Sequence, residues 1–404
     1  VSTEQAIGWD PITGEVTKSI TTDPTFSSKL SETILAYTNS AYSTMGAKSV
    51  DPSNKNMLTA PLKTTVLAGN IIQGSDGQLK EGEFYKMIAG TKTTWRQSIP
   101  KRVFDNTTNS YITQSMSVPD WKPFKTYVFN GDVNDANWKE TGEPTLFNKR
   151  NLITETKSVG NRFSASKLGY DQQYTLCSAS DAKYAEFTFS SFEDQETVAS
   201  GLVHFGGEVT KGDLRRSTAI PHTGKYSAKV PGGTIGPGYY SKGLTVGRSY
   251  RASVWVHIGS SDNAALVVAL NGTVNGAAIP PKTILKSNPS NITVGEWILM
   301  TITIDVPFNY VSGSGPIDLS VYLQNSGVDA YFDDFMFRPV DAVIQGNVID
   351  ETTGRVLATL DNQNFATKYE YDKSGKLYKV CVESPVDGLK LRTKYTYNFK
   401  RPVN

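Results

Sequence analysis

The chain has 404 residues, 38% of them hydrophobic and 20% charged, which is long enough for two or three separate hydrophobic cores. Its 41 Lys and Arg residues nearly balance its 39 Asp and Glu residues. The resulting formal net charge of +2 gives no electrostatic footprint of a protein that binds nucleic acid or an anionic membrane. No apolar run approaches the ~20 residues of a transmembrane helix, so we expect no membrane-spanning segment.

The residue types predict an all-β protein. The chain contains 20 Tyr, 17 Phe and 34 Gly residues with many Thr and Val; the aromatic and β-branched residues suit pleated sheets, and Gly suits turns. The sequence opens with VSTEQAIGWD, without Met or an apolar leader, so we expect a piece of a longer protein. Cys177 and Cys381 are too few for a small disulfide scaffold, and we interpret them as buried, inert thiols, with a disulfide between them as the alternative.

The first predicted element is a β-hairpin at residues 9–16, WDPITGEV. An aromatic or apolar residue precedes an Asp, a short polar turn with a Gly follows, and a charged and then an aliphatic residue close the pattern. In such a hairpin the Asp accepts hydrogen bonds from the turn backbone and the Gly takes a positive φ. The pattern returns at residues 349–356 and 371–377, and a weaker copy lies at residues 152–165. These copies predict a scaffold assembled from similar hairpins.

Residues 186–339 have a different pattern, with short alternating strands separated by Gly, Pro, Ser and Asn. The stretches SYRASVWVHI, EWILMTITIDV, IDLSVYLQN and AYFDDFMFRP are typical of a β-sandwich. The sequence therefore predicts a hairpin region at residues 1–185, an inserted sandwich at 186–339 and C-terminal hairpins at 340–404.

Alternation along the predicted strands separates a core face from an outer face. The expected core residues are Tyr250, Ala252, Val254, Val256, Ile258, Ile298, Met300, Ile302, Ile304, Leu319, Val321 and Leu323. The outer face carries Arg251, Trp255, His257, Tyr322 and Gln324, which we expect to form one ligand-binding cleft, since aromatic rings stack on sugars and polar groups bond their hydroxyls. In the alternative interpretation, the neighbouring hairpins cover Trp255, and Tyr322 lies at an interdomain contact.

Two resemblances add to these patterns. YDKSGKLYKV resembles a YD repeat of the RHS type, and WDPITGEV, residues 93–129 and residues 168–194 are similar to RHS-like surface proteins of Bacteroidetes, although Lys376 stands where Arg is usual. This resemblance covers residues 1–190 and 340–404. It implies the C-terminal part of a large scaffold or adhesin, secreted or displayed on the outer surface of a Gram-negative bacterium. The route of export would be of the type 9 secretion kind that also serves gliding motility.

Residues 186–339 resemble the jelly-roll carbohydrate-binding modules, with galactose-binding-like features, which implies a glycan as partner. The same resemblance implies a structural Ca²⁺ held by Glu193, by the backbone carbonyl of Lys225 and by Asp333, with Asp334 as the alternative to Asp333. Hard oxygen ligands from three chain segments suit this ion. Solvated surface carboxylates are the simpler interpretation of these acidic residues.

The sequence lacks motifs of catalysis. None of its 3 His residues lies in an HExxH motif, and no GxSxG or Walker A sequence occurs, so we expect no enzyme. Adjacent carboxylates such as Asp333 and Asp334 should point to opposite faces of a strand. Three functions remain: a surface scaffold or adhesin with a sugar-binding sandwich, a structural partner docked on an outer-membrane secretion or gliding complex without binding sugar, and the accessory region of a polysaccharide-degrading enzyme.

Overall fold

The computed structural model describes residues 2–22, 28–73, 79–131 and 138–397, and the side chains of residues 70–85 lie outside this description. Its regular elements are β-strands and short 3-10 helices, which confirms the all-β prediction. Among the described residues, no helix has the length and apolar character needed to cross a membrane. The chain forms two compact units. The first contains residues 1–101, 115–147 and 156–161, and the second contains residues 102–114, 148–155 and 162–404.

The first unit consists mainly of antiparallel strands that pair in sequence order. They are β1 (Thr3–Trp9), β2 (Val16–Thr22), β3 (Ser28–Leu35), β4 (Pro61–Gln73), β5 (Leu79–Asp105), β6 (Ser110–Phe129) and β7 (Trp138–Phe147), with the 3-10 helices η1 (Ala36–Thr38) and η2 (Ser40–Met45) before β4. Strands β5 and β6 continue into the second unit, where their connecting tip, residues 102–114, belongs. Ile99, Val118 and Phe147 form a small buried cluster in the first unit.

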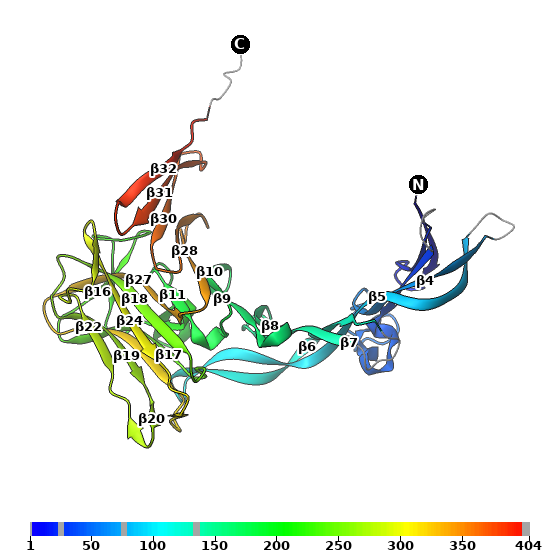
Figure 1. Cartoon of the computed structure of the whole chain (residues 1–404), viewed down its shortest axis with the longest axis horizontal. Helices are drawn as coiled ribbons and strands as arrows, with labels where there is room; N and C mark the ends of the chain where they lie inside the picture. Colours follow the sequence, from blue (N-terminus) through cyan, green and yellow to red (C-terminus); the bar gives the residue numbers. More distant parts are fainter. Residues whose placement is uncertain (1, 23–27, 74–78, 132–137, 398–404) are drawn as a thin grey trace, which may run out of the picture. The chain divides into compact units, whose positions relative to one another are not determined.

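The hairpins on the two sides of the sandwich belong to one sheet. In the second unit, β9 (Phe163–Gly169) pairs with β10 (Tyr174–Ser180), which pairs antiparallel with β28 (Val343–Ile349). The sheet continues through β29 (Val356–Leu360), β30 (Ala366–Tyr371), β31 (Leu377–Ser384) and β32 (Gly388–Lys394). The pairing of Ala179 with Ile344 in this ladder therefore joins two segments that are separated by the whole sandwich, and Figure 1 shows β10 beside β28.

The repeated Asp–Gly pattern forms the turns that the sequence predicts. In each turn, the Asp backbone N–H donates across the turn at 2.8 Å to the carbonyl of the residue after the Gly, and the Gly N–H donates to the Asp carbonyl. Each Asp Oδ1 also accepts backbone N–H groups of its own turn, and each Gly has a positive φ of 68° to 82°. The pairs are Asp10 with Gly14, Asp350 with Gly354, and Asp372 with Gly375. The weaker copy is also a hairpin, formed by β8 (Ile153–Ser158), η4 (Val159–Asn161) and β9.

The inserted segment is a sandwich of two seven-stranded sheets. The β18 sheet contains β15 (Arg215–Ser217), β16 (Ser227–Val230), β27 (Ala330–Pro339), β18 (Ser249–His257), β24 (Trp297–Asp305) and β23 (Ile292–Val294), and β11 (Thr188–Ser190) pairs with β27. The β26 sheet contains β12 (Glu196–Ala199), β13 (Leu202–Phe205), β14 (Val209–Thr210), β17 (Thr234–Ser241), β26 (Leu319–Asn325), β19 (Ala264–Leu270) and β22 (Lys282–Leu285). Short elements complete the segment: η5 (Tyr184–Glu186), η6 (Gly206–Glu208), β20 (Gly272–Val274), β21 (Ala277–Ala278) and β25 (Tyr310–Ser312).

The core lies between these two sheets, and the predicted inward faces are confirmed with one exception. The expected core residues of β18, β24 and β26 belong to a single buried cluster or pack against it. Ile258 is 43% exposed because it follows the last residue of β18 and no longer alternates with the strand. The first and last strands of the segment, β11 and β27, pair antiparallel, which places its two ends side by side. A domain inserted into a continuous sheet needs such adjacent ends.

The two cysteines do not form a disulfide. Cys177 is buried in β10 and Cys381 is half-buried in β31, with β28, β29 and β30 between them. Four strand spacings of about 4.8 Å separate them by roughly 19 Å, whereas the Cα atoms of a disulfide lie within about 7 Å. Burial raises the pKa of the Cys177 thiol to about 12, which makes that thiol inert, as expected.

Candidate functional site

The five residues of the predicted cleft lie on two different faces. Arg251, Trp255 and His257 belong to β18, whereas Tyr322 and Gln324 belong to β26 in the opposite sheet. The outer faces of the two sheets of a sandwich point in opposite directions. The prediction of one shared cleft is therefore wrong, although each residue does point away from the core as the alternation indicates.

Trp255 is fully buried by the C-terminal hairpins, as the alternative interpretation expected. Its Nε1 donates to the carbonyl of Asn364 at 2.7 Å. Its ring stacks on His222 at 4.5 Å between ring centroids and meets Phe365 edge-on at 5.7 Å. A sugar cannot reach this ring. His257 lies at the end of the same strand, where its Nδ1 accepts the N–H of Gly259 at 3.1 Å.

The outer face of the β26 sheet is hollowed next to Tyr322. A cavity of about 520 Å³ lies over β13, β14 and β17, and the tip of the β5–β6 hairpin, through Asn109, provides part of its wall. Tyr240, His204, Thr210 and Lys211 line it with one aromatic ring and several hydrogen-bonding groups. This combination is typical of carbohydrate sites, in which a ring covers the apolar face of a sugar and polar groups bond its hydroxyls.

Tyr240 is the residue of this hollow that sequence reasoning missed. A Cβ atom added to Gly238 would lie 2.9 Å from the Tyr240 ring, so the absence of a side chain at 238 leaves the ring room to lie along the sheet. Gly238 is also the cross-strand partner of Tyr322, so the two tyrosines lie close on one face. Burial and the neighbouring Tyr322 hydroxyl raise the pKa of Tyr240, which therefore stays a neutral phenol. The available signal was strand alternation in GPGYYS, residues 236–241, which places Tyr240 on the same face as Gly236 and Gly238.

His204 is held at the edge of this hollow by the hairpin tip. Its Nδ1 lies 3.1 Å from the hydroxyl of Tyr111, and Phe104 meets its ring edge-on at 5.0 Å between centroids. Burial lowers the pKa of His204 to about 4, despite the opposing charge of Glu208. The imidazole is therefore neutral at pH 7 and is a hydrogen-bonding group without a charge.

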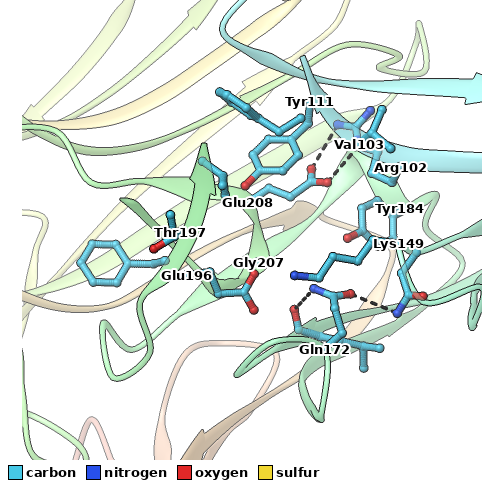
Figure 2. Close-up of a pocket in the computed structure, with 15 residues that line it drawn as sticks. Arg102, Val103, Tyr111, Lys149, Gln172, Tyr184, Glu196, Thr197, Gly207 and Glu208 are labelled. Carbon is cyan, nitrogen blue, oxygen red and sulfur yellow. Dashed lines mark hydrogen bonds and ion pairs between the residues drawn. The ribbon is translucent and has the colours of Figure 1, made fainter. Parts of the chain in front are cut away.

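A smaller cavity of about 190 Å³ is lined in part by Arg102 and Tyr111 of the β5–β6 hairpin tip (Figure 2). Figure 2 shows Lys149 and Glu196 directed into it. Gln172 also lines it, and its Oε1 accepts a hydrogen bond from Asn148 Nδ2 at 3.1 Å. The Glu196 carboxylate accepts the N–H of Asp171 at 3.1 Å, and burial raises its pKa. The cavity thus has a polar lining, most of which is already engaged in hydrogen bonds within the chain.

Glu208 is the centre of a buried charge network at this cavity. Both of its oxygens accept hydrogen bonds from Arg102, at 2.9 and 3.1 Å (Figure 2). Lys167, which is fully buried, lies 3.3 Å from the same carboxylate and 4.3 Å from the ring centroid of Tyr184. Burial alone would raise the pKa of Glu208, but the charges of Arg102 and Lys167 outweigh burial and lower it. This carboxylate is fixed as an anion, which suits an anchor for the hairpin tip better than an acid catalyst.

The segments of the predicted calcium site do come together. Glu193 Oε1 accepts the N–H groups of Lys225 at 2.7 Å and Tyr226 at 2.9 Å. A Cβ atom on Gly224 would lie 2.2 Å from that oxygen, and φ at Gly224 is +64°, so the turn requires glycine. Asp333 Oδ2 accepts the N–H of His222 at 2.8 Å from the other side. Glu193 and Asp333 are both buried, so the interpretation as solvated surface carboxylates is wrong.

Asp334 does not point away from Asp333 as strand alternation predicts. Its φ of +49° interrupts the alternation, and the β18–β27 register shifts at this position. Its carboxylate accepts the Thr223 hydroxyl at 2.7 Å and lies 2.7 Å from His222 Nδ1, while Glu383 lies 2.9 Å from His222 Nε2. Burial alone would lower the pKa of His222, but these two carboxylates outweigh burial and raise it. Asp334 is therefore a partner of His222 rather than a free metal ligand.

Burial and the nearby charges of Asp334 and Glu193 raise the pKa of Asp333 well above its usual value. Burial likewise raises the pKa of Glu193 to about 7. Within the described residues, no group of three or more His, Cys, Asp or Glu side chains is arranged to hold a metal ion. A site here would thus depend on two side chains, Glu193 and Asp333, and on backbone oxygens. Glu193 Oε2 makes no hydrogen bond within the described part of the chain, and carboxylate and carbonyl oxygens are the ligands that Ca²⁺ prefers.

Comparison with protein-family models and with curated proteins gives no match. Among solved structures, a family 16 carbohydrate-binding module is 15% identical over 31% of this chain and 85% of its own, with a TM-score of 0.24. The CBM22-1 xylan-binding domain of Paenibacillus barcinonensis Xyn10C is 14% identical over 39% of this chain and 97% of its own, with a TM-score of 0.25. The enzymatically active domain of bacteriophage CBA120 tailspike protein 4 is 13% identical over 39% of this chain and 20% of its own, with a TM-score of 0.22. Similarities of this size establish neither a ligand nor an activity for this chain.

Proposed function

We propose that this chain is a non-catalytic β-scaffold whose inserted sandwich binds a glycan on the outer face of the β26 sheet. The observation that carries this proposal is the hollow of about 520 Å³ beside Tyr322, lined by Tyr240, His204, Thr210 and Lys211. Its volume lies within the range of about 300–1,000 Å³ that is usual for small-molecule sites. The mixture of one flat ring with hydroxyl, imidazole and amine groups suits a neutral, hydroxylated ligand.

The attachment of the sandwich to the flanking hairpins supports a display function. The sheet continues directly from β10 to β28, and β11 and β27 pair at the base of the sandwich. Trp255, Glu208 and the His222 network add buried contacts from both flanks. A module held in this way has little freedom to rotate and presents one fixed face to a partner.

Two features favour binding over catalysis. Glycoside hydrolysis uses two carboxyl groups that face each other across about 5–9 Å, one of them able to give up a proton. In the cavity of Figure 2, Glu208 is occupied by Arg102 and Lys167, and Glu196 accepts a backbone hydrogen bond. In the larger hollow, the lining residues include no carboxylate.

We further propose that the scaffold works outside the cell or at the outer surface of a Gram-negative bacterium, as an adhesin exported by a type 9-like route. The similarity of the flanking hairpins to YD repeats supports this location. Protease accessibility of the chain on intact source cells tests it, because a protein retained inside the cells would be protected.

We also propose that a structural calcium ion lies between Glu193 and Asp333. Two buried carboxylates with raised pKa values support it, because a divalent cation would relieve their mutual repulsion. The Lys225 carbonyl would supply a third oxygen. The ion would tie the Thr223–Lys225 turn to the last strand of the sandwich.

The glycan proposal is tested by screening the full chain on a glycan array and measuring affinities by calorimetry. The variant Tyr240→Ala should weaken binding of the best ligand roughly ten-fold or more, since an aromatic side chain stacked on the apolar face of a ligand ring contributes about 1–3 kcal/mol. Tyr378→Ala, a half-buried tyrosine of β31 outside the sandwich, is the matched control and should bind normally. An array without any ligand would instead favour the structural-partner function, and pull-down from membrane extracts would then identify what docks.

A further inference from the structure

A separate cavity lies on the outer face of the β18 sheet, on the opposite side of the sandwich from Tyr240. Its volume is about 230 Å³, and strands β18, β23 and β24 form its floor. The turn between β29 and β30 supplies another wall. The residues that matter for its chemistry are Arg251, Asn291, Leu299, Thr301, Gln363 and Phe365.

Arg251 is a cation without a partner in this cavity. Its Nε is shielded from solvent and makes no hydrogen bond. In the described part of the chain, no carboxylate forms an ion pair with Arg251. A guanidinium carries five N–H donors in a planar fork that fits a carboxylate, and leaving buried donors unpaired is unfavourable. The structure therefore contains an anion-binding group for which the described residues supply no anion.

A second arginine next to Arg251 adds to this uncompensated positive charge. Arg338 lies directly opposite it on β27, and like charges in that position repel. Arg338 is satisfied by backbone carbonyls: its Nε donates to Asn362 at 2.8 Å, and its Nη1 donates to Pro339 at 2.8 Å and Val340 at 3.0 Å. Arg338 is therefore hydrogen-bonded through both Nε and Nη1, whereas the Arg251 side chain makes no hydrogen bond to the residues that the structure describes. The nearby Asp361 does not pair with Arg251. The Asp361 charge favours the charged form of Arg338, and the Asp361 carboxylate accepts the backbone N–H groups of Gln363 and Phe365.

An unpaired acceptor lines the same cavity. The side-chain amide nitrogen of Asn291 donates to the carbonyls of Leu285 and Lys286, both at 2.9 Å, which fixes the orientation of the amide. Its Oδ1 is then shielded from solvent without a donor. Leu299 and Phe365 are buried and give the cavity an apolar wall, and Thr301 adds a hydroxyl. The site thus offers a cation, a hydroxyl acceptor and an apolar surface to one ligand.

We propose that this cavity binds one sugar residue that carries a carboxylate, a uronic acid. The carboxylate pairs with Arg251, a ring hydroxyl donates to Asn291 Oδ1, and the apolar face of the ring packs against Phe365. At about 230 Å³ the cavity is smaller than typical drug-sized sites of about 300–1,000 Å³, which suits a single ring rather than a chain. This inference does not depend on glycan binding at Tyr240, because the two sites lie on opposite faces.

The test uses the full chain and three probes at equal ionic strength: D-glucuronate, D-glucose and acetate. We expect glucuronate to bind with a dissociation constant on the order of 1 mM in calorimetry and to raise the thermal unfolding midpoint, since a ligand that binds only the folded state stabilises it. Glucose lacks the carboxylate and acetate lacks the hydroxylated ring, so neither should bind measurably. Equal effects of acetate and glucuronate would mean a general anion effect and would overturn the proposal, as would no effect of glucuronate.

Variants locate the binding. Arg251→Met should weaken glucuronate binding roughly ten- to hundredfold, as expected for loss of a charge-assisted hydrogen bond. Arg215→Met, an exposed residue of β15 in the same sheet, is the matched control and should bind as the unmodified chain does. If Arg251→Met fails to fold, Asn291→Asp serves instead, because a new carboxylate in the lining would repel the ligand and abolish binding. Retained affinity in a folded Arg251→Met or Asn291→Asp variant would refute the site, whereas loss of glycan binding in Tyr240→Ala alone would leave it intact.

Discussion

The buried network around Glu208 gives a sharp prediction for Glu208→Gln. Glu208 and its partner Arg102 are nearly inaccessible, with 6% and 8% of their side chains exposed, and Lys167 is fully buried. Removing the anion leaves two buried cations without a counter-charge. Breaking a buried pair in this way costs about 3–5 kcal/mol of unfolding free energy. Arg102→Met should cost less, about 1–3 kcal/mol, because Glu208 keeps Lys167 as a partner.

The assay is urea unfolding read by hydrogen exchange of peptides from the second unit. The two compact units need not unfold together, so a global signal would mix them. Glu370→Gln is the matched control, because its ion pair with Lys379 is exposed and should contribute no more than about 1 kcal/mol. The urea midpoint should fall in Glu208→Gln without a change in the slope of the transition.

The pH dependence gives a second check on the same group. The pKa of Glu208 is lower in the folded than in the unfolded state, so its stabilising effect is complete above the unfolded value of about 4.3 and is lost as pH falls through the folded value. The difference between the unmodified chain and Glu208→Gln should therefore be full at pH 7 and shrink in acid below about pH 4.3. A Glu208→Gln effect as small as that of Glu370→Gln, or one that stays constant into acid, would refute the reasoning.

Two further predictions concern other buried groups. Calcium at about 1 mM should raise the thermal midpoint of the unmodified chain and a chelator should lower it, with no effect in Glu193→Gln; equal responses in both proteins would contradict the proposed ion. The lowered pKa of His204, about 4 against the usual 6.5, means that the unfolded state binds an extra proton between these values, so stability should fall as pH drops from 6.5 towards 4. The loss should reach roughly 1–3 kcal/mol at pH 4 and be absent in His204→Asn, and an identical pH profile of the two proteins would show that His204 is not responsible.

The hairpin turns could be predicted because their hydrogen bonds are local. Asp10, Asp350 and Asp372 each cap a turn within four or five residues of their own position, and a Gly with positive φ completes it. The core faces of β18, β24 and β26 were predictable for the same reason, since strand alternation follows from backbone geometry alone.

The ligand face was not predictable, because alternation does not say which sheet a strand joins. Arg251 and Tyr322 both point outward, yet they lie on opposite sides of the sandwich. Which strands pair depends on contacts between segments far apart in sequence, and the same pattern would suit either sheet. The direction of the Asp334 side chain was not predictable from alternation either. One positive φ in β27 turns this side chain towards Thr223, which Asp333 also contacts.

The sequence by itself determined the strand content, the Asp–Gly turns and the inward faces of the sandwich, because these follow from propensity, turn chemistry and a two-residue period. Only the tertiary structure decided that Trp255 is covered, that Tyr240 lines a hollow and that Arg102 meets Glu208, a residue 106 positions away. The physical reason is that burial and charge pairing depend on which distant segments pack together.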